Sequence, residues 1–183
     1  MIDVIKIIQT RAFARQDGAV LGAVWIASFA CTMWAASPKY SFLALLANIL
    51  TISTPFVLAK RLKNFRDYAL DGSISFRRAL FYCFQTFFNA TLLLTLVQYL
   101  WFWLIDTGAF MTLLTTNYRI VMQAYQLSEA ETQTVLDAIM QMKPIAWASM
   151  FMVTDLIVGA VLSPIIAALM ARKTNTRKTI VQQ

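Results

Sequence analysis

The chain has 183 residues, of which 59% are hydrophobic and only 14% are charged, whereas about 25% are charged in ordinary soluble domains. This composition excludes a soluble globular domain. The chain also contains no histidine, which removes the commonest metal ligand and the commonest general base, and with them Ser-His-Asp, Cys-His and most zinc mechanisms.

Four apolar runs account for the excess of hydrophobic residues. Each run is long enough, at about 1.5 Å per helical residue, to cross a hydrocarbon core of about 30 Å. Helices are required because backbone amides that face lipid must be bonded within their own segment. The sequence therefore predicts one all-α membrane domain, with four transmembrane helices in two antiparallel hairpins, over residues 18–36, 41–59, 79–105 and 144–171.

The N-terminal residues 1–17 have the pattern of an amphipathic helix, which either lies at the membrane interface or continues into the first span. The first span, at residues 18–36, is longer than the hydrophobic region of a signal peptide, which is about 7–15 residues. We expect it to be retained. It begins with "GAVLG", in which Gly18 and Gly22 form a small-residue seam. Such a seam packs either within the bundle or against a second copy or partner.

The basic residues set the predicted orientation. Thirteen of the 16 Lys and Arg residues lie in the N-terminal tail, the loop after the second span and the C-terminal tail, and three lie in the other two loops. The positive-inside rule then places both termini on the cytoplasmic side. Because these residues flank the spans, they suit anionic lipid rather than nucleic acid. The predicted cytoplasmic segments are 1–17, 60–78 and 172–183, and the outer segments are 37–40 and 106–143.

The loop "KRLKNFRDYALDGSISFRRA" (60–79) is predicted to continue the second span as a helix before it turns. Gly72 supplies the backbone freedom that the turn needs, Ser73 or Ser75 caps the next helix, and Phe76 begins the apolar pattern of the third span. The neighbours Arg66 and Asp67 are predicted to be a solvated pair that contributes little.

The outer segment 106–143 is predicted to be mostly helical. Ser128 followed by Glu131 is a capping-box signature, and Val135, Ile139 and Met142 follow at helical spacing. The helix either rests on the bundle or the outer leaflet, or acts as a lid or a docking element for a partner.

Asp155 is the one acidic residue inside a predicted span, where a carboxylate costs about 2.5–3.5 kcal/mol on insertion scales. Steps of four residues lead from Asp155 to Gly159 and Ser163, a small-residue stripe that indicates a second packing seam and directs Asp155 into the bundle. Asn48, at a similar depth, is its predicted partner. The candidate intramembrane polar site consists of Asp155, Asn48, Asn89, Thr95 and Gln98.

Two interpretations of this polar site stay open: bonding between helices that stabilises the bundle, or a proton or substrate site in a carrier. A lone acid without a histidine, metal ligands or a second acid lacks a partner for acid–base catalysis. Cys31 and Cys83 both lie in apolar runs, and we interpret them as packing residues. The sequence therefore predicts no catalytic residues, no metal site and no cofactor.

Three stretches carry a resemblance to a known family: "NFRDYALDGSISFRRAL", "FWLIDTGAF" and "YQLSEAETQTVLDAIMQMKP". They resemble the bacterial family known as domain of unknown function 4199, small four-span inner-membrane proteins, from about residue 11 to 173. The family's turn pattern falls on Arg66, Asp67, Gly72, Ser75 and Phe76, its Asp-Pro on Asp106, where Thr107 replaces the proline, and its outer helix on Ser128 and Glu129.

The resemblance implies a multi-pass protein of the bacterial inner membrane with no agreed activity, expected near cell-envelope glycosyltransferases. Our leading functional hypothesis is a non-enzymatic scaffold or accessory subunit of a cell-envelope assembly, whose partners are the lipid bilayer and a membrane protein or further copies of itself. The alternative is a small carrier or channel for protons, ions or a lipid intermediate that uses Asp155. We expect no nucleic-acid partner.

Overall fold

The structure is a computed structural model that describes residues 4–105, 108–126 and 128–171. Four of its helices are long and apolar enough to cross a membrane, so the predicted all-α, four-span fold is confirmed and the chain is a multi-pass membrane protein. The Asp106 motif and the tail 172–183 lie outside the described residues. The elements are α1 (Val4–Ala35), η1 (Pro38–Tyr40), α2 (Leu43–Ala69), α3 (Phe76–Leu104), α4 (Gly108–Ala124), α5 (Glu129–Met140) and α6 (Pro144–Met170).

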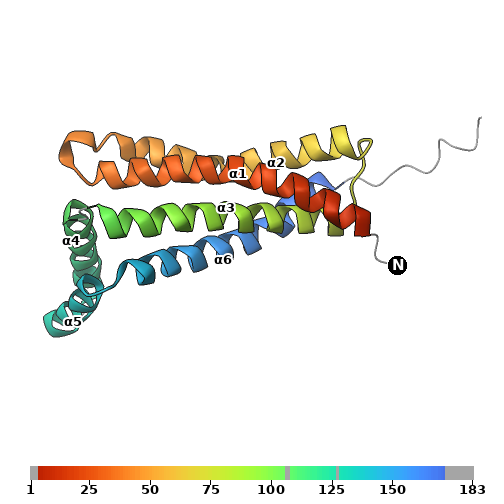
Figure 1. Cartoon of the computed structure of the whole chain (residues 1–183). Coiled ribbons are helices and arrows are strands. Elements are labelled where there is room, and N and C mark those ends of the chain that lie inside the picture. Colours follow the sequence, from red (N-terminus) through yellow and green to blue (C-terminus); the bar gives the residue numbers. More distant parts are fainter. Residues whose placement is uncertain (1–3, 106–107, 127, 172–183) are drawn as a thin grey trace, which may run out of the picture.

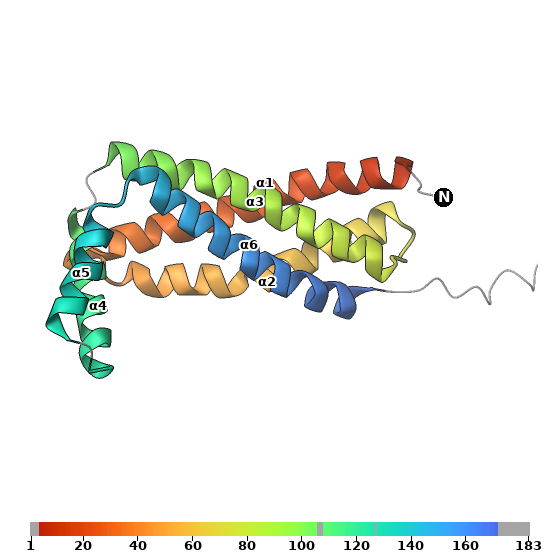
Figure 2. The ribbon, with the colours of Figure 1, turned by 90° about the horizontal axis from the view of Figure 1, so that it is seen from below.

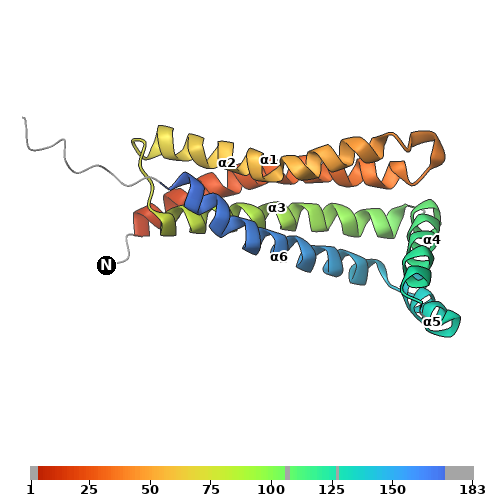
Figure 3. The ribbon, with the colours of Figure 1, turned by 180° about the vertical axis from the view of Figure 1, so that it is seen from behind.

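The long helices form two hairpins, which pack against each other mainly through α1 and α3. Helices α1 and α2 form the first hairpin, α3 and α6 form the second, and α3 packs along both α1 and α6. The bundle has two distinct ends (Figures 1 and 3). At one end, which we call the basic end, lie the start of α1 and the α2–α3 turn. At the other, the α4 end, α4 and α5 lie across the bundle (Figure 2).

Helix α1 has 32 residues and is about 48 Å long at 1.5 Å per residue, which is longer than a hydrocarbon core of about 30 Å. The predicted amphipathic segment therefore continues into the first span as one helix. Its first half packs on α3 at the basic end, where Thr10 accepts a hydrogen bond of 3.0 Å from Nε of Arg78.

The α2–α3 turn has the predicted chemistry. Gly72 has a φ of +76°, the left-handed region that glycine adopts without strain. Its N–H donates to the carbonyl of Arg66 at 3.1 Å and so closes the end of α2. Ser75, rather than Ser73, caps α3, because its hydroxyl accepts from the backbone N–H of Arg78. Phe76 is the first residue of α3 and is exposed.

The outer segment forms two helices, α4 and α5. The predicted capping box is confirmed: the hydroxyl of Ser128 accepts from the backbone N–H of Glu131, whose carboxylate accepts in return from the backbone N–H of Ser128 at 3.2 Å. Leu136, rather than Val135, is the buried apolar residue of α5. No residue of α4 is buried within the described chain.

The predicted glycine seams of α1 and α6 both pack against α3. A Cβ at Gly18 would lie 2.7 Å from Cβ of Asn89, and one at Gly159 would lie 2.8 Å from Cβ of Phe87. Gly22 also lies against α3 but less closely, since a Cβ there would lie 3.4 Å from Cα of Ala90. Of the two alternatives for "GAVLG", the structure supports packing within the bundle, since these glycines let α1 and α6 approach α3 closely. Ser163 is buried beside Gly159 and donates to its carbonyl at 2.6 Å.

Candidate functional site

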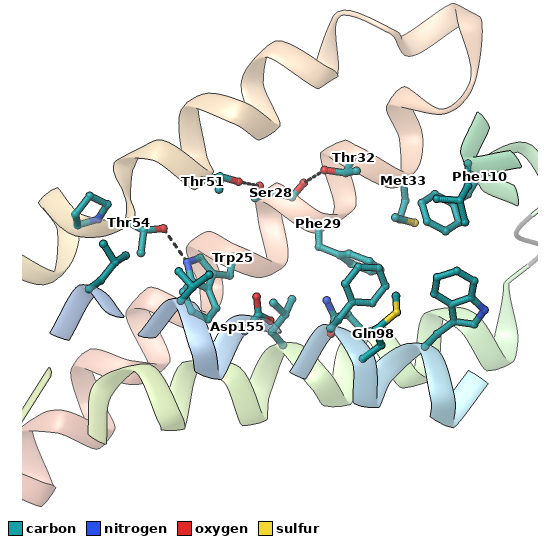
Figure 4. Close-up of a pocket in the computed structure, with 18 residues that line it drawn as sticks. Trp25, Ser28, Phe29, Thr32, Met33, Thr51, Thr54, Gln98, Phe110 and Asp155 are labelled. Atoms are coloured by element: carbon teal, nitrogen blue, oxygen red, sulfur yellow. Dashed lines mark hydrogen bonds between the residues drawn. The ribbon is translucent and has the colours of Figure 1, made fainter. Parts of the chain in front are cut away.

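A cavity of about 490 Å³ lies between the two hairpins, toward the α4 end. Figure 4 shows Trp25, Phe29 and Met33 pointing into it from α1, with Asp155 and Gln98 on the opposite side and Phe110 of α4 at one end. The cavity exists because α2 and α6 contact each other at the basic end, and the hairpins separate toward the α4 end (Figures 1 and 3). Its walls are largely apolar and aromatic.

On the α1–α2 side of the cavity, the polar groups bond to one another. Nε1 of Trp25 donates to the hydroxyl of Thr54 at 2.9 Å. The hydroxyl of Ser28 lies 2.9 Å from both the carbonyl of Ala47 and the hydroxyl of Thr51. These bonds join α1 to α2 in a membrane, where an unpaired polar group is expensive. This wall has its hydrogen bonds already made.

The α3–α6 side is different, because it holds buried polar atoms without a hydrogen-bond partner among the described residues. Oδ2 of Asp155 and Oε1 of Gln98 are two such atoms, and both residues line the cavity. The hydroxyls of Thr91 and Thr95 and Nε1 of Trp147 are also buried without a hydrogen-bond partner among the described residues. A buried acceptor that lacks a donor costs about 1–3 kcal/mol. This wall is therefore chemically incomplete.

The structure brings together only part of the predicted polar site. Asp155 and Gln98 line one cavity, and Thr95 lies about one turn from Gln98 with its hydroxyl buried. Asn89 instead donates to the carbonyl of Gln85 at 2.7 Å and lies against Gly18 on the α1–α3 seam.

Asn48 was predicted to be the partner of Asp155, and the structure corrects this. Asn48 is exposed and does not line the cavity. Helix α2 turns Ala47, Thr51 and Thr54 toward α1, and each residue of a helix is rotated by about 100° from the one before it. Asn48 is therefore turned by about 100° from Ala47, which contacts α1, and it lies at an exposed position.

A second acidic residue was missed by sequence reasoning. Asp17, the last residue of the predicted amphipathic segment 1–17, is only 7% exposed. Its carboxylate accepts a hydrogen bond from the hydroxyl of Tyr82 and lies 3.6 Å from the guanidinium of Arg61. The available signal was its position, directly before an apolar run in a segment that contains no proline.

The pair Arg66 and Asp67 is also more than a solvated pair. Arg66 is 3% exposed and donates to both oxygens of Asp67, at 2.7 and 3.2 Å. Its Nη1 donates at 3.1 Å to the carbonyl of Met170, the last residue of α6. Terminal helix carbonyls lack partners within the helix, so Arg66 fixes the end of α6 to α2.

No group of three or more His, Cys, Asp or Glu side chains capable of holding a metal ion occurs in the described part of the chain. The cavity offers a largely apolar surface, with the polar side chains of Asp155 and Gln98 on its α3–α6 side. This is the chemistry of a binding site for a molecule that is mostly apolar and carries one or two hydrogen-bond donors.

The fold and this cavity define a helical, multi-pass membrane protein with an intramembrane cavity between two hairpins. The family described as "Protein of unknown function (DUF4199)" matches residues 16–172. The chain belongs to this family, and the predicted resemblance is confirmed. Among curated proteins and among solved structures, no match was found.

Proposed function

We propose that this protein binds a small amphiphilic molecule in the cavity between its hairpins and carries it within the membrane, without catalysing a reaction. The observation that supports this proposal is that Asp155 and Gln98, each with a buried oxygen that lacks a partner among the described residues, line a largely apolar cavity. The proposal selects the lipid-intermediate form of the carrier hypothesis over protons or ions.

The size of the cavity favours a small molecule over a protein segment. A helix with side chains is about 10–12 Å across, so one that crosses the hydrocarbon core fills on the order of 2,000 Å³. The cavity of about 490 Å³ cannot hold such a helix. It falls within the range of about 300–1,000 Å³ that is usual for small-molecule sites.

The chemistry of the walls defines the class of ligand. A carboxylate and an amide oxygen accept hydrogen bonds, so the ligand offers hydroxyl or amino groups to Asp155 and Gln98. The aromatic surface of Phe29 and Phe151 suits an apolar chain. The ligand reaches the cavity from the lipid, because Thr51 of α2 and Val158 of α6 both line the cavity and are exposed.

The test uses two tryptophans that line the cavity, Trp25 and Trp147, and a bromine-labelled long-chain alcohol as the probe, because bromine quenches indole fluorescence on contact. We expect saturable quenching of the reconstituted protein. The Asp155→Leu variant should weaken binding by about 10- to 100-fold, because a hydrogen bond to a charged group contributes about 1.5–3 kcal/mol.

The matched control is Thr154→Val, which changes the neighbouring residue on the exposed face of α6 and should bind the probe as the wild type does. Quenching that rises linearly without saturation, or equally in wild type and Asp155→Leu, would reject the site. Carriage is measured separately, as movement of the same probe between leaflets of proteoliposomes. A rate equal to that of protein-free vesicles would reject the carrier function.

An accessory role in a cell-envelope assembly of the bacterial inner membrane, with the basic end in the cytoplasm, is the second candidate. The observation that favours it is α4, which has no buried residue and exposes Ile120 and Val121. A membrane-protein partner, such as the envelope glycosyltransferase that the family resemblance suggests, or a second copy, would cover this face. Photo-crosslinking from position 120 in native membranes tests it, and recovery of lipid adducts alone would reject it.

A further inference from the structure

We propose a second binding site, at the basic end, for the phosphate group of an anionic phospholipid. It lies between α1 and α3, in a concave surface of about 360 Å³ lined by Ile8, Arg11, Arg15 and Gln85. This site is separate from the cavity at Asp155, and the proposal does not depend on the carrier function.

The concave surface forms where the α1–α3 seam opens. At Gly18 the two helices are so close that a Cβ would lie 2.7 Å from Cβ of Asn89. Arg15 and Arg11 occupy the preceding turns of the same stripe of α1, and their long side chains do not fit into so close a contact. The helices therefore leave a recess with two guanidinium groups along one side and the Gln85 amide on the other.

The arginines of the basic end differ in what they contact. Arg61 lies beside Asp17 and Arg66 binds Asp67, so each has a carboxylate partner. Arg78 is also engaged, because it donates to the side chains of Thr10 and Gln9.

In contrast, Arg11 has the ring of Phe81 at 5.8 Å, a contact that orients a guanidinium without neutralising it. Within the described residues, no hydrogen bond or ion pair engages the guanidinium of Arg15. Two positive charges, of which that of Arg11 is oriented by Phe81, thus line one recess, and no described residue places an anion against them.

Phosphate is the anion that this geometry fits, because guanidinium groups bind its oxygens through paired N–H donors and the Gln85 amide adds a further donor. We assign the phosphate to a lipid rather than to a soluble molecule. Phe88, three residues after Gln85 and on the same side of α3, is exposed and gives an acyl chain a surface next to the recess. Basic pockets between membrane helices bind anionic headgroups in this way.

The experiment measures binding of short-chain phosphatidylglycerol to the protein in neutral detergent by native mass spectrometry, with phosphatidylcholine for comparison. We expect each protein to bind one molecule of phosphatidylglycerol about tenfold more tightly than it binds phosphatidylcholine. The double variant Arg11→Gln/Arg15→Gln should remove this preference. The matched control Lys60→Gln/Lys63→Gln removes the same charge from exposed positions of α2 at the same end and should keep it.

A second double variant, Arg11→Lys/Arg15→Lys, keeps the charge but loses the paired donors, and we expect a partial loss, of about threefold. This variant keeps the site testable even if Arg11→Gln/Arg15→Gln fails to fold. Equal loss in the Lys60/Lys63 control would show unspecific attraction and overturn the proposal. Competition by inorganic phosphate at equal concentration would overturn the assignment to a lipid, and equal binding of both lipids would overturn the site.

Discussion

Asp17 and Asp155 are two acidic residues in membrane-spanning helices, and the protein treats them in opposite ways. Asp17, in α1, has a hydroxyl partner from α3 and a guanidinium from α2. Asp155, about midway along α6, has an oxygen that is buried without a hydrogen-bond partner in the described structure. The helices around Asp17 converge, whereas the hairpins around Asp155 separate.

The difference indicates which acid is structural and which is available for binding. At the basic end, polar side chains from α1, α2 and α3 reach one another. The ring of Phe65 of α2 stacks on the ring of Tyr82, with 5.0 Å between the ring centroids. Toward the α4 end the hairpins leave a cavity lined by Asp155 and Gln98, each of which has a buried oxygen without a partner among the described residues. An unpaired acceptor raises the free energy of the folded state, so we expect the two acids to respond to substitution with opposite signs.

The largest expected effect is the loss of stability in Asp17→Ala. This change removes the acceptor of a buried tyrosine hydroxyl, so the free energy of unfolding should fall by about 2–3 kcal/mol, as measured by detergent denaturation in mixed micelles. Asp137→Ala, at an exposed position of α5, serves as the control and should change it by about 0.5 kcal/mol or less. If both variants lose the same amount, Asp17 is not a structural acid.

The next effect has the opposite sign. Asp155→Leu removes an unpaired carboxylate oxygen from the membrane interior, so the free energy of unfolding should rise by about 1–2 kcal/mol in the same assay. The side chain has space, because the position borders the cavity. A stability loss as large as that of Asp17→Ala would mean that Asp155 has a structural partner and would remove the contrast.

The features that the sequence predicted well are those that depend on neighbouring residues. The four spans follow from continuous hydrophobicity, the turn from Gly72, and the α5 capping box from Ser128 and Glu131 three residues apart. The direction of Asp155 was also predictable, because the small residues at Gly159 and Ser163 mark the face of α6 that packs on α3.

The features that the sequence did not reveal depend on distant residues. Tyr82 bonds to Asp17 across 65 positions, and Arg66 bonds to Met170 across 104. No local pattern encodes such pairs. Asn48 was misplaced for the same reason, since depth in the membrane follows from the sequence, whereas the rotation of α2 about its axis is set by its packing on α1.

A smaller effect is expected from Tyr82, the hydrogen-bond donor to Asp17. Tyr82→Phe removes the hydroxyl that donates to Asp17 and leaves the ring stacked on Phe65, so we expect the free energy of unfolding to fall by about 1 kcal/mol. The double variant with Asp17→Ala should lose less than the sum of the two single losses, because both remove one interaction. Strict additivity in this double-mutant cycle would show that the two side chains do not act together.

The smallest effect concerns Glu131, an acid that is fully exposed and yet partnered. Hydrogen bonds from the side chain and backbone of Ser128 lower the pKa of Glu131 below its ordinary value. A lowered folded-state pKa means that this contribution to α5 is present above the ordinary pKa and is lost as the pH falls through the folded one. Hydrogen-exchange protection factors of the first turn of α5 should therefore decrease from neutral pH to about pH 3. In Ser128→Ala, protection should be lower at neutral pH and nearly independent of pH. If this variant kept the pH response of the wild type, the response would not come from the hydrogen bonds between Glu131 and Ser128.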